Sequence, residues 1–119
     1  MKLKQRSIIY ITFDPSKGSE IQKRRPALVM SRDNYNLASN LVIVCPITTT
    51  SKQRPYLIPL KSEIQNKVVK PHSKVNTMQV YTLDVTKDGH RYPEYLGRLD
   101  RTEFLIIGER FLQDFNLPF

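Results

Sequence analysis

Two adjacent arginines, Arg24 and Arg25, stand where a polar segment gives way to the apolar run "PALVMS". Thr48 and Thr49 stand where a second apolar run, "LVIVCPITT", ends, and further cationic residues follow them. Guanidinium groups and hydroxyls are donors that suit a phosphate. If the fold brings these two strand ends together, they would form an anion site fit for phosphate chemistry.

Both groups also have an ordinary structural explanation. Arginine pairs on small domains are usually solvated, and threonines suit edge strands and loops. From the residue pattern alone, the structural interpretation of Thr48 outweighs the functional one. For Arg25 the two interpretations are evenly balanced.

Motifs for other chemistries are missing from the sequence. It has no CxxC, no HExxH and no glycine-rich phosphate loop, and its two histidines, His72 and His90, stand in unlike polar segments. We therefore expect no metal and no cofactor. The single cysteine, Cys45, lies in an apolar run, which is typical of an inert core residue and excludes an intramolecular disulfide. The expected location is a reducing cytoplasm.

Length and charge bound the class of protein. The 119 residues fit one compact domain covering 1–119. Lysine and arginine number 19 against 11 acidic residues, and the resulting formal charge of +8 would attract polyanions. Nucleic acid is the first candidate partner, an acidic protein the second and an anionic membrane surface the third. No stretch approaches the roughly 18 apolar residues that a membrane span requires, so we expect no membrane insertion.

Short apolar segments separated by turn-forming residues predict an antiparallel β-domain. A polar segment at 32–40 could hold a helical turn, and 14–23 is expected to be a long loop. Closely spaced short strands suggest a small barrel or half-barrel, in which strand ends on one side surround a shared concavity. The expected strands are 7–13, 26–31 with Pro26 at its first position, 41–49 with an edge or bulge at Pro46, 56–60, 67–70 and 74–83.

The last segment predicts one amphipathic helix. Asp100 is a good N-cap, and Glu103 completes a capping-box pattern. Leu99 and Phe104 could form the hydrophobic staple that often accompanies it. We expect the helix to pack on the barrel through an apolar stripe, with its aromatic side chains in the core: Phe104, Ile107, Phe111 and Phe115, widened by Leu105 and Leu112.

Three blocks of the sequence, "FDPSKGSEIQKRRPALVMS", "NLVIVCPITT" and "MQVYTLD", resemble in order and spacing the MazF/PemK family of toxin endoribonucleases. These are the mRNA interferases of bacterial toxin–antitoxin modules, and the resemblance extends from about residue 7 to residue 112. It implies a small SH3-like antiparallel β-barrel with a C-terminal α-helix, acting as a homodimer. It also implies metal-independent cleavage of single-stranded RNA at short sequences, and neutralisation by an acidic antitoxin.

The resemblance also implies the site residues. The arginine directly before the motif proline corresponds to Arg25 and the threonine after Cys-Pro-Ile to Thr48, and these positions carry catalysis in the family. Gly18 belongs to a loop that borders the RNA groove, together with the two residues after it. The expected RNA-binding residues are Ser19, Glu20, Arg24, Thr49, Lys52, Arg54 and Gln79.

Cleavage without a metal would use the 2′-hydroxyl of the RNA, which attacks the adjacent phosphorus in line and leaves a 2′,3′-cyclic phosphate and a 5′-hydroxyl. Arginine stays protonated in proteins, so Arg25 would stabilise charge on the phosphoryl oxygens rather than transfer a proton. Thr48 would hydrogen-bond the phosphate or orient the 2′-hydroxyl. Arg24 would be a second phosphate contact or simply solvated.

The sequence departs from the family pattern where some relatives have an acid/base pair. Ser19 and Met78 replace a histidine and a carboxylate, which leaves Glu20 as the nearest carboxylate by motif. The segment 87–95, "KDGHRYPEY", looks like an elaboration that could alter base preference.

Two other functions fit parts of the sequence. A non-catalytic, CcdB-like toxin on the same barrel would poison DNA gyrase through its C-terminal end. The Arg-Pro loop and the strand end at Thr48 would then have no role. A basic SH3-like nucleic-acid-binding module would use the charge of +8 without any chemistry.

Overall fold

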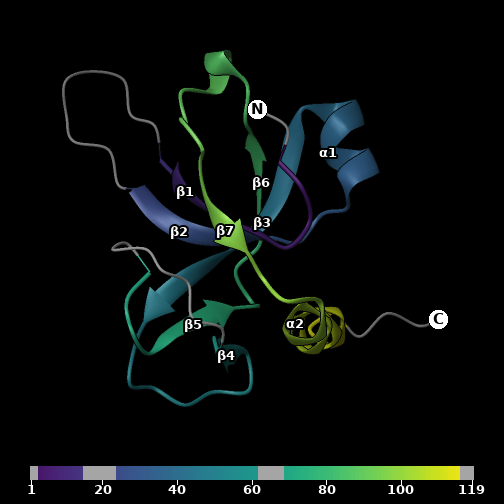
Figure 1. The fold of residues 1–119 in the computed structure, drawn as a ribbon. Coiled ribbons are helices and arrows are strands. Elements are labelled where there is room, and N and C mark those ends of the chain that lie inside the picture. Colours follow the sequence, from purple (N-terminus) through teal and green to yellow (C-terminus); the bar gives the residue numbers. More distant parts are fainter. Residues whose placement is uncertain (1–2, 15–23, 62–68, 116–119) are drawn as a thin grey trace.

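The computed structural model describes residues 3–14, 24–61 and 69–115, and Figure 1 shows how the elements are arranged. All strand pairs in these ranges are antiparallel. The elements are β1 (Ser7–Thr12), β2 (Arg24–Val29), α1 (Asp33–Ser39), β3 (Leu41–Thr49), β4 (Leu57–Pro59), β5 (Ser73–Asn76), β6 (Tyr81–Asp84), the 3-10 helix η1 (Lys87–Gly89), β7 (Glu94–Arg98) and α2 (Arg101–Gln113).

The strands form one bent sheet in the order β4-β5-β3-β2-β1-β7, with β6 also paired to β3. Strand β3 has three partners: its first half pairs with β6, its centre with β2 and its last residues with β5. The predicted small antiparallel barrel with a C-terminal helix is therefore confirmed. The barrel is half-open, because β4 and β7 lie at opposite ends of the strand order in the described part of the chain.

The central strands are buried on both faces, because each face carries its own apolar cluster. Ile8, Leu28 and Cys45 belong to one cluster, and their neighbours in sequence, such as Ile9 and Val44, belong to the other. Alternation along a strand sends successive side chains to opposite faces. The nearly continuous apolar runs in the sequence are explained by this double coverage.

Helix α2 covers the first of these clusters. Its N-cap is confirmed, since the Asp100 carboxylate accepts hydrogen bonds from Thr102 N at 3.0 Å and Glu103 N at 3.3 Å. Phe104 and Ile107 are buried in the cluster together with Leu99, as the staple and stripe predicted. No helix within the described ranges is long and apolar enough to cross a membrane.

The predicted apolar stripe of α2 is too wide. Leu105 is 62% exposed and Leu112 is 68% exposed. Each stands one residue beyond a side chain that packs inward, and one residue rotates a helix by about 100°, which carries the next side chain away from the core. Phe115 is 46% exposed and packs edge-on against Phe111, with 5.2 Å between the ring centroids.

After β4, the predicted single strand 74–83 is wrong, and residues 67 and 68 of the predicted strand 67–70 lie outside the described residues. The segment 74–83 is not one strand but two, β5 and β6, separated by a turn at 77–80. The side-chain oxygen of Asn76 accepts from Met78 N at 3.1 Å, and its carbonyl accepts from Gln79 N at 3.4 Å. This turn interrupts the pairing without reversing the chain, because β5 and β6 are both antiparallel to β3. Of the predicted strand 67–70, only Val69 and Lys70 are described, and neither is in a strand.

Strand β7 was not predicted. It pairs with β1 from Ser7 opposite Arg98 to Tyr10 opposite Glu94, with a bulge between Ile8 and Ile9. Its own residues are exposed or half-buried throughout, so it lacks the apolar alternation by which a strand is recognised in sequence.

Candidate active site

A cavity of about 360 Å³ opens where β2 and β3 part. It contains both residues predicted to be catalytic, Arg25 and Thr48, together with Arg24 and Thr49. The two strand ends that suggested an anion site therefore do meet in the fold. The full lining is Tyr10, Arg24, Arg25, Pro26, Ile47, Thr48, Thr49, Lys70 and Ser73.

Pro26 explains why the strands part at this point. It is the third residue of β2, not the first as predicted, since β2 begins at Arg24. Met30 N donates to Ile43 O at 2.8 Å. Along an antiparallel strand every second residue directs its backbone N–H and C=O at the same neighbour, so the backbone groups of residues 30, 28 and 26 face β3. Pro26 has no N–H to donate, and the β2–β3 ladder ends at Ala27 opposite Pro46.

The register then places the site residues. Ala27 opposes Pro46 in the last pair, so continuing the count brings Arg25 opposite Thr48 across the opening. Beyond Pro46, β3 pairs with β5 instead, with Thr48 opposite Lys74. Pro46 itself lies where the β6 pairing has ended and the β5 pairing has not begun, so its missing donor costs no ladder bond on that side. The edge predicted at Pro46 is therefore present.

The two arginines point to opposite faces of β2. The guanidinium carbon of Arg24 lies 4.8 Å from the Tyr10 ring centroid, whereas that of Arg25 lies 5.5 Å from the Phe13 ring centroid. Tyr10 in β1 and Phe13 just after the strand lie on different faces of the sheet, so this is the alternation expected of adjacent strand residues. Each contact is a cation–π interaction that holds its guanidinium over a ring.

Arg24 is committed to the protein. Its Nη1 donates to Thr12 Oγ1 at 2.9 Å and to Arg91 O at 3.2 Å, and its Nη2 donates to Tyr10 O at 3.2 Å and to Tyr92 O at 2.7 Å. Four hydrogen bonds leave little donor capacity for a ligand. The prediction that Arg24 is either a phosphate contact or solvated therefore misses its main contacts, which tie residues 91–92 to β1 and β2.

Arg25 is uncommitted by comparison. Its guanidinium makes no hydrogen bond or ion pair with any residue in the described ranges, and it is only half-buried. The Thr48 hydroxyl likewise has no hydrogen-bond partner in those ranges. A permanently charged fork and a hydroxyl are thus both available to a phosphate that enters the cavity.

The other predicted contacts do not all reach the cavity. Lys52, Arg54 and Gln79 are exposed and lie outside its lining, while Ser19 and Glu20 lie outside the described residues. Sequence reasoning missed three polar residues of the described lining: Tyr10, Lys70 and Ser73. Ser73 reaches the site because it pairs with Thr49, a register that no local pattern in the sequence reveals.

The lining is strongly cationic. Arg24, Arg25 and Lys70 contribute positive charge, and the described lining contains no carboxylate and no imidazole. Cys45 lies nearby in β3, and burial, with a smaller effect from Asp114, raises the pKa of its thiol to about 12. The thiol is therefore protonated at neutral pH and inert, as predicted. Within the described part of the chain no group of three His, Cys, Asp or Glu side chains could hold a metal ion.

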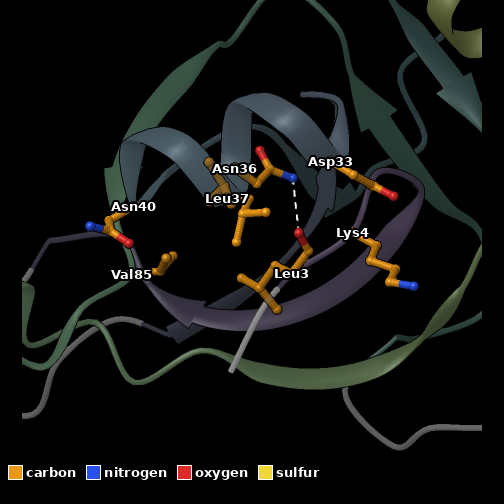
Figure 2. A pocket seen from close by; sticks show the side chains of 8 residues that line it. Leu3, Lys4, Asp33, Asn36, Leu37, Asn40 and Val85 are labelled. Atoms are coloured by element: carbon orange, nitrogen blue, oxygen red, sulfur yellow. Dashed lines mark hydrogen bonds between the residues drawn. The ribbon is translucent and has the colours of Figure 1, made fainter.

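A different cavity, of about 180 Å³, lies under α1 (Figure 2). Its walls are mainly the apolar side chains of Leu3, Leu37 and Val85, and Asn36 Nδ2 closes one side by donating to Leu3 O at 2.9 Å. In the part of the chain that the structure describes, Lys4 is the one cation of this lining and no arginine belongs to it. The cavity therefore lacks the guanidinium donors that recommend the cavity between β2 and β3.

The fold and the cavity define a class: a small, half-open antiparallel barrel with a cationic cavity sized for a phosphodiester. A model of the family described as PemK-like, MazF-like toxin of type II toxin–antitoxin systems matches residues 4–114, and the chain belongs to this family. The endoribonuclease toxin MazF of Escherichia coli strain K12 is 32% identical over 101 residues, which cover 85% of this chain and 90% of that protein.

Solved structures support the same fold. MazF from Deinococcus radiodurans superposes with a TM-score of 0.78 at 21% identity, covering 98% of this chain and 99% of that one. A mycobacterial endoribonuclease in complex with its cognate antitoxin superposes with a TM-score of 0.72 at 20% identity, covering 98% of each chain.

Proposed function

We propose that this toxin is a sequence-specific endoribonuclease that cleaves single-stranded RNA without a metal ion and thereby inhibits translation and growth. The observation that carries the proposal is the convergence of Arg25 and Thr48 on one cationic cavity, with their donor groups uncommitted in the described part of the chain. The endoribonuclease class is that of the E. coli relative, which is 32% identical over most of both chains.

In the proposed reaction the 2′-oxygen of the RNA attacks the adjacent phosphorus and the bond from phosphorus to the 5′-oxygen breaks. The products are a 2′,3′-cyclic phosphate and a 5′-hydroxyl, and the proton lost by the 2′-hydroxyl is balanced by the proton gained at the leaving oxygen. Arg25 donates to the phosphoryl oxygens as their charge grows, and Thr48 donates to the same phosphate or orients the 2′-hydroxyl.

The described lining holds no group suited to accept the 2′-hydroxyl proton. We therefore assign to Arg25 and Thr48 charge stabilisation and positioning rather than proton transfer. Glu20, the nearest carboxylate by motif, lies outside the described residues and stays a proposal as a base or as part of the RNA-binding loop.

RNA would reach the cavity along cationic and polar groups on both sides. Thr49 and Lys70 line the cavity and would contact the phosphates beside the cleaved one. Exposed side chains beyond the cavity would contact the RNA backbone further from the cleaved phosphate. We propose this role for Lys52, Arg54 and Gln79, together with Ser19.

Two partners are proposed for the toxin, which would work in the cytoplasm. An acidic antitoxin would neutralise it, since a chain of charge +8 attracts acidic segments and the mycobacterial relative was solved with its cognate antitoxin. A second copy of the chain would form a homodimer. The outer face of α2 suits such an association, because Ile106 and Leu112 are each more than half exposed there.

Incubation of the purified protein with a defined single-stranded RNA in excess EDTA tests the proposal. We expect cleavage at a short recurrent sequence. The downstream fragments should carry 5′-hydroxyl ends that polynucleotide kinase can label, and the upstream fragments should end in a 2′,3′-cyclic phosphate. An RNA with a single 2′-deoxynucleotide at the mapped site is the matched control and should stay intact there, because it lacks the nucleophile. Cleavage that EDTA abolishes, or that proceeds at the deoxynucleotide, would exclude the mechanism. Inhibition of gyrase with intact RNA would favour the CcdB-like alternative.

A further inference from the structure

A second cationic cavity lies at the other end of β1. It has a volume of about 500 Å³ and shares no lining residue with the candidate active site. Arg98 opposes Ser7 at this end of β1, whereas Arg25 opposes Ile11 at the other, so the two cavities are separated by roughly 13 Å along the strand. We name it the arginine cleft. Its lining is Gln5, Arg6, Arg32, Asp33, Asn34, Arg98, Arg101, Phe104 and Leu105.

Two of its arginines are fixed in place by the backbone. Arg6 has a φ of 74°, a left-handed conformation that is uncommon for residues other than glycine. Its N–H donates to Val29 O at 3.0 Å, and its Nη1 donates to Leu99 O at 3.1 Å. Arg98 Nε donates to Gln5 O at 3.2 Å. These bonds hold both guanidinium groups at the cleft before any ligand arrives, which lowers the cost of binding one.

The other two arginines carry charge that the described residues do not neutralise. Arg32 and Arg101 are exposed, and their guanidinium groups make no hydrogen bond or ion pair in the described ranges. Among the described residues the lining contains one carboxylate, Asp33, and its Oδ1 already accepts from Gln5 N at 2.8 Å. Four guanidinium groups against one carboxylate make the cleft a site for an anionic partner.

The apolar wall of the cleft indicates what kind of anion fits. Leu105 is 62% exposed and presents an aliphatic surface next to Arg101. Phe104 is only 8% exposed, so it has no free ring face on which a nucleobase could stack. Arginines around an exposed aliphatic side chain match a peptide that carries both acidic and apolar residues better than they match a sugar–phosphate backbone.

We propose that the arginine cleft is a docking site for an acidic peptide segment that places an apolar side chain against Leu105 while its carboxylates pair with Arg32 and Arg101. The site goes beyond the proposed RNA cleavage. The assignment of this peptide to an antitoxin rests on the proposed function, in which the toxin has an acidic inhibitor. Occupation of the cleft would add affinity to any segment of the same partner that reaches the active site.

The test uses a fluorescein-labelled, 12-residue synthetic peptide with six glutamates and two leucines, titrated by fluorescence anisotropy with the full-length protein. The Arg32→Gln/Arg101→Gln variant should bind this peptide about tenfold more weakly. The matched control, Lys61→Gln/Lys87→Gln, removes the same charge from exposed lysines outside all three cavities and should bind within about twofold of wild type. A peptide with serines in place of its leucines should bind wild type about fivefold more weakly.

Three results would overturn the proposal. Equal losses of peptide affinity in the cleft variant and the lysine variant would show that the effect comes from net charge alone. If the cleft variant lost as much affinity for a 12-nucleotide uncleavable RNA as for the peptide, the cleft would be an RNA-binding site. An equal loss of peptide affinity on Arg25→Ala would place the peptide in the active site instead. RNA cleavage is measured on the same proteins and should be unchanged in the cleft variant. If wild type cleaves no RNA, the proposed function fails while the peptide titrations still decide the docking site.

Discussion

Replacing Arg25 with alanine is expected to slow RNA cleavage by about 10²–10³-fold, because one donor aimed at developing negative charge contributes about 3–4 kcal/mol to the barrier. The fold should survive the change. The guanidinium lies over the Phe13 ring and has no hydrogen bond in the described ranges, so the free energy of unfolding should fall by about 1 kcal/mol or less. Single-turnover cleavage of the mapped RNA measures the first effect and thermal melting the second.

Two further variants separate charge from geometry at the same site. Arg25→Lys keeps the charge but loses the planar fork, so it should recover only part of the rate. Thr48→Val keeps the volume but removes the hydroxyl, and a rate loss smaller than that of Arg25→Ala is expected. Lys61→Ala removes an exposed cation outside the cavity and serves as the matched control, with wild-type cleavage expected. A folded Arg25→Ala protein that cleaves at the wild-type rate would remove the catalytic role proposed for this residue.

Elements with strong local signals could be predicted from the sequence. The run 41–49 is rich in β-branched residues and matches β3, and the cap at Asp100 fixes the start of α2. β7 could not be predicted, because its side chains face solvent or are half-buried and its stability comes from pairing with β1. Pairing between distant segments leaves little trace in either segment alone.

The candidate site shows the same difference between what a local pattern predicts and what strand pairing determines. The family resemblance pointed to Arg25 and Thr48, and both line the cavity. What the sequence could not show is why they meet, which depends on the missing donor of Pro26 ending one ladder while β3 continues with another strand. The presence of Ser73 follows from that second ladder. Composition and motif give residue types, whereas register decides which of them become neighbours.

Arg24 is the residue whose neighbourhood was hardest to foresee, and its replacement by alanine is expected to lower the free energy of unfolding by about 2–3 kcal/mol. Its guanidinium donates four hydrogen bonds, to Thr12 Oγ1 and to the carbonyls of Tyr10, Arg91 and Tyr92. Alanine would leave these acceptors to solvent where water can reach them and unpaired elsewhere. Urea denaturation measures the change. Arg54→Ala is the matched control and should be near neutral, because within the described residues the exposed Arg54 side chain bonds only to the adjacent carbonyl of Gln53.

Salt dependence distinguishes this structural role from a phosphate contact. Each phosphate contact to single-stranded RNA contributes about 0.7 to the slope of log affinity against log salt concentration. Binding of an uncleavable RNA to Arg24→Ala, measured at a temperature where the variant is folded, should keep the wild-type slope, whereas Arg25→Ala should lose about 0.7. Arg24→Lys preserves the charge but cannot reach four acceptors, so it should remain destabilised. An Arg24→Ala protein of wild-type stability with a reduced slope would show that Arg24 binds phosphate. Both adjacent arginines would then act on the RNA. The expected result is instead a division of roles, in which Arg24 holds the strand ends together and Arg25 acts on the RNA.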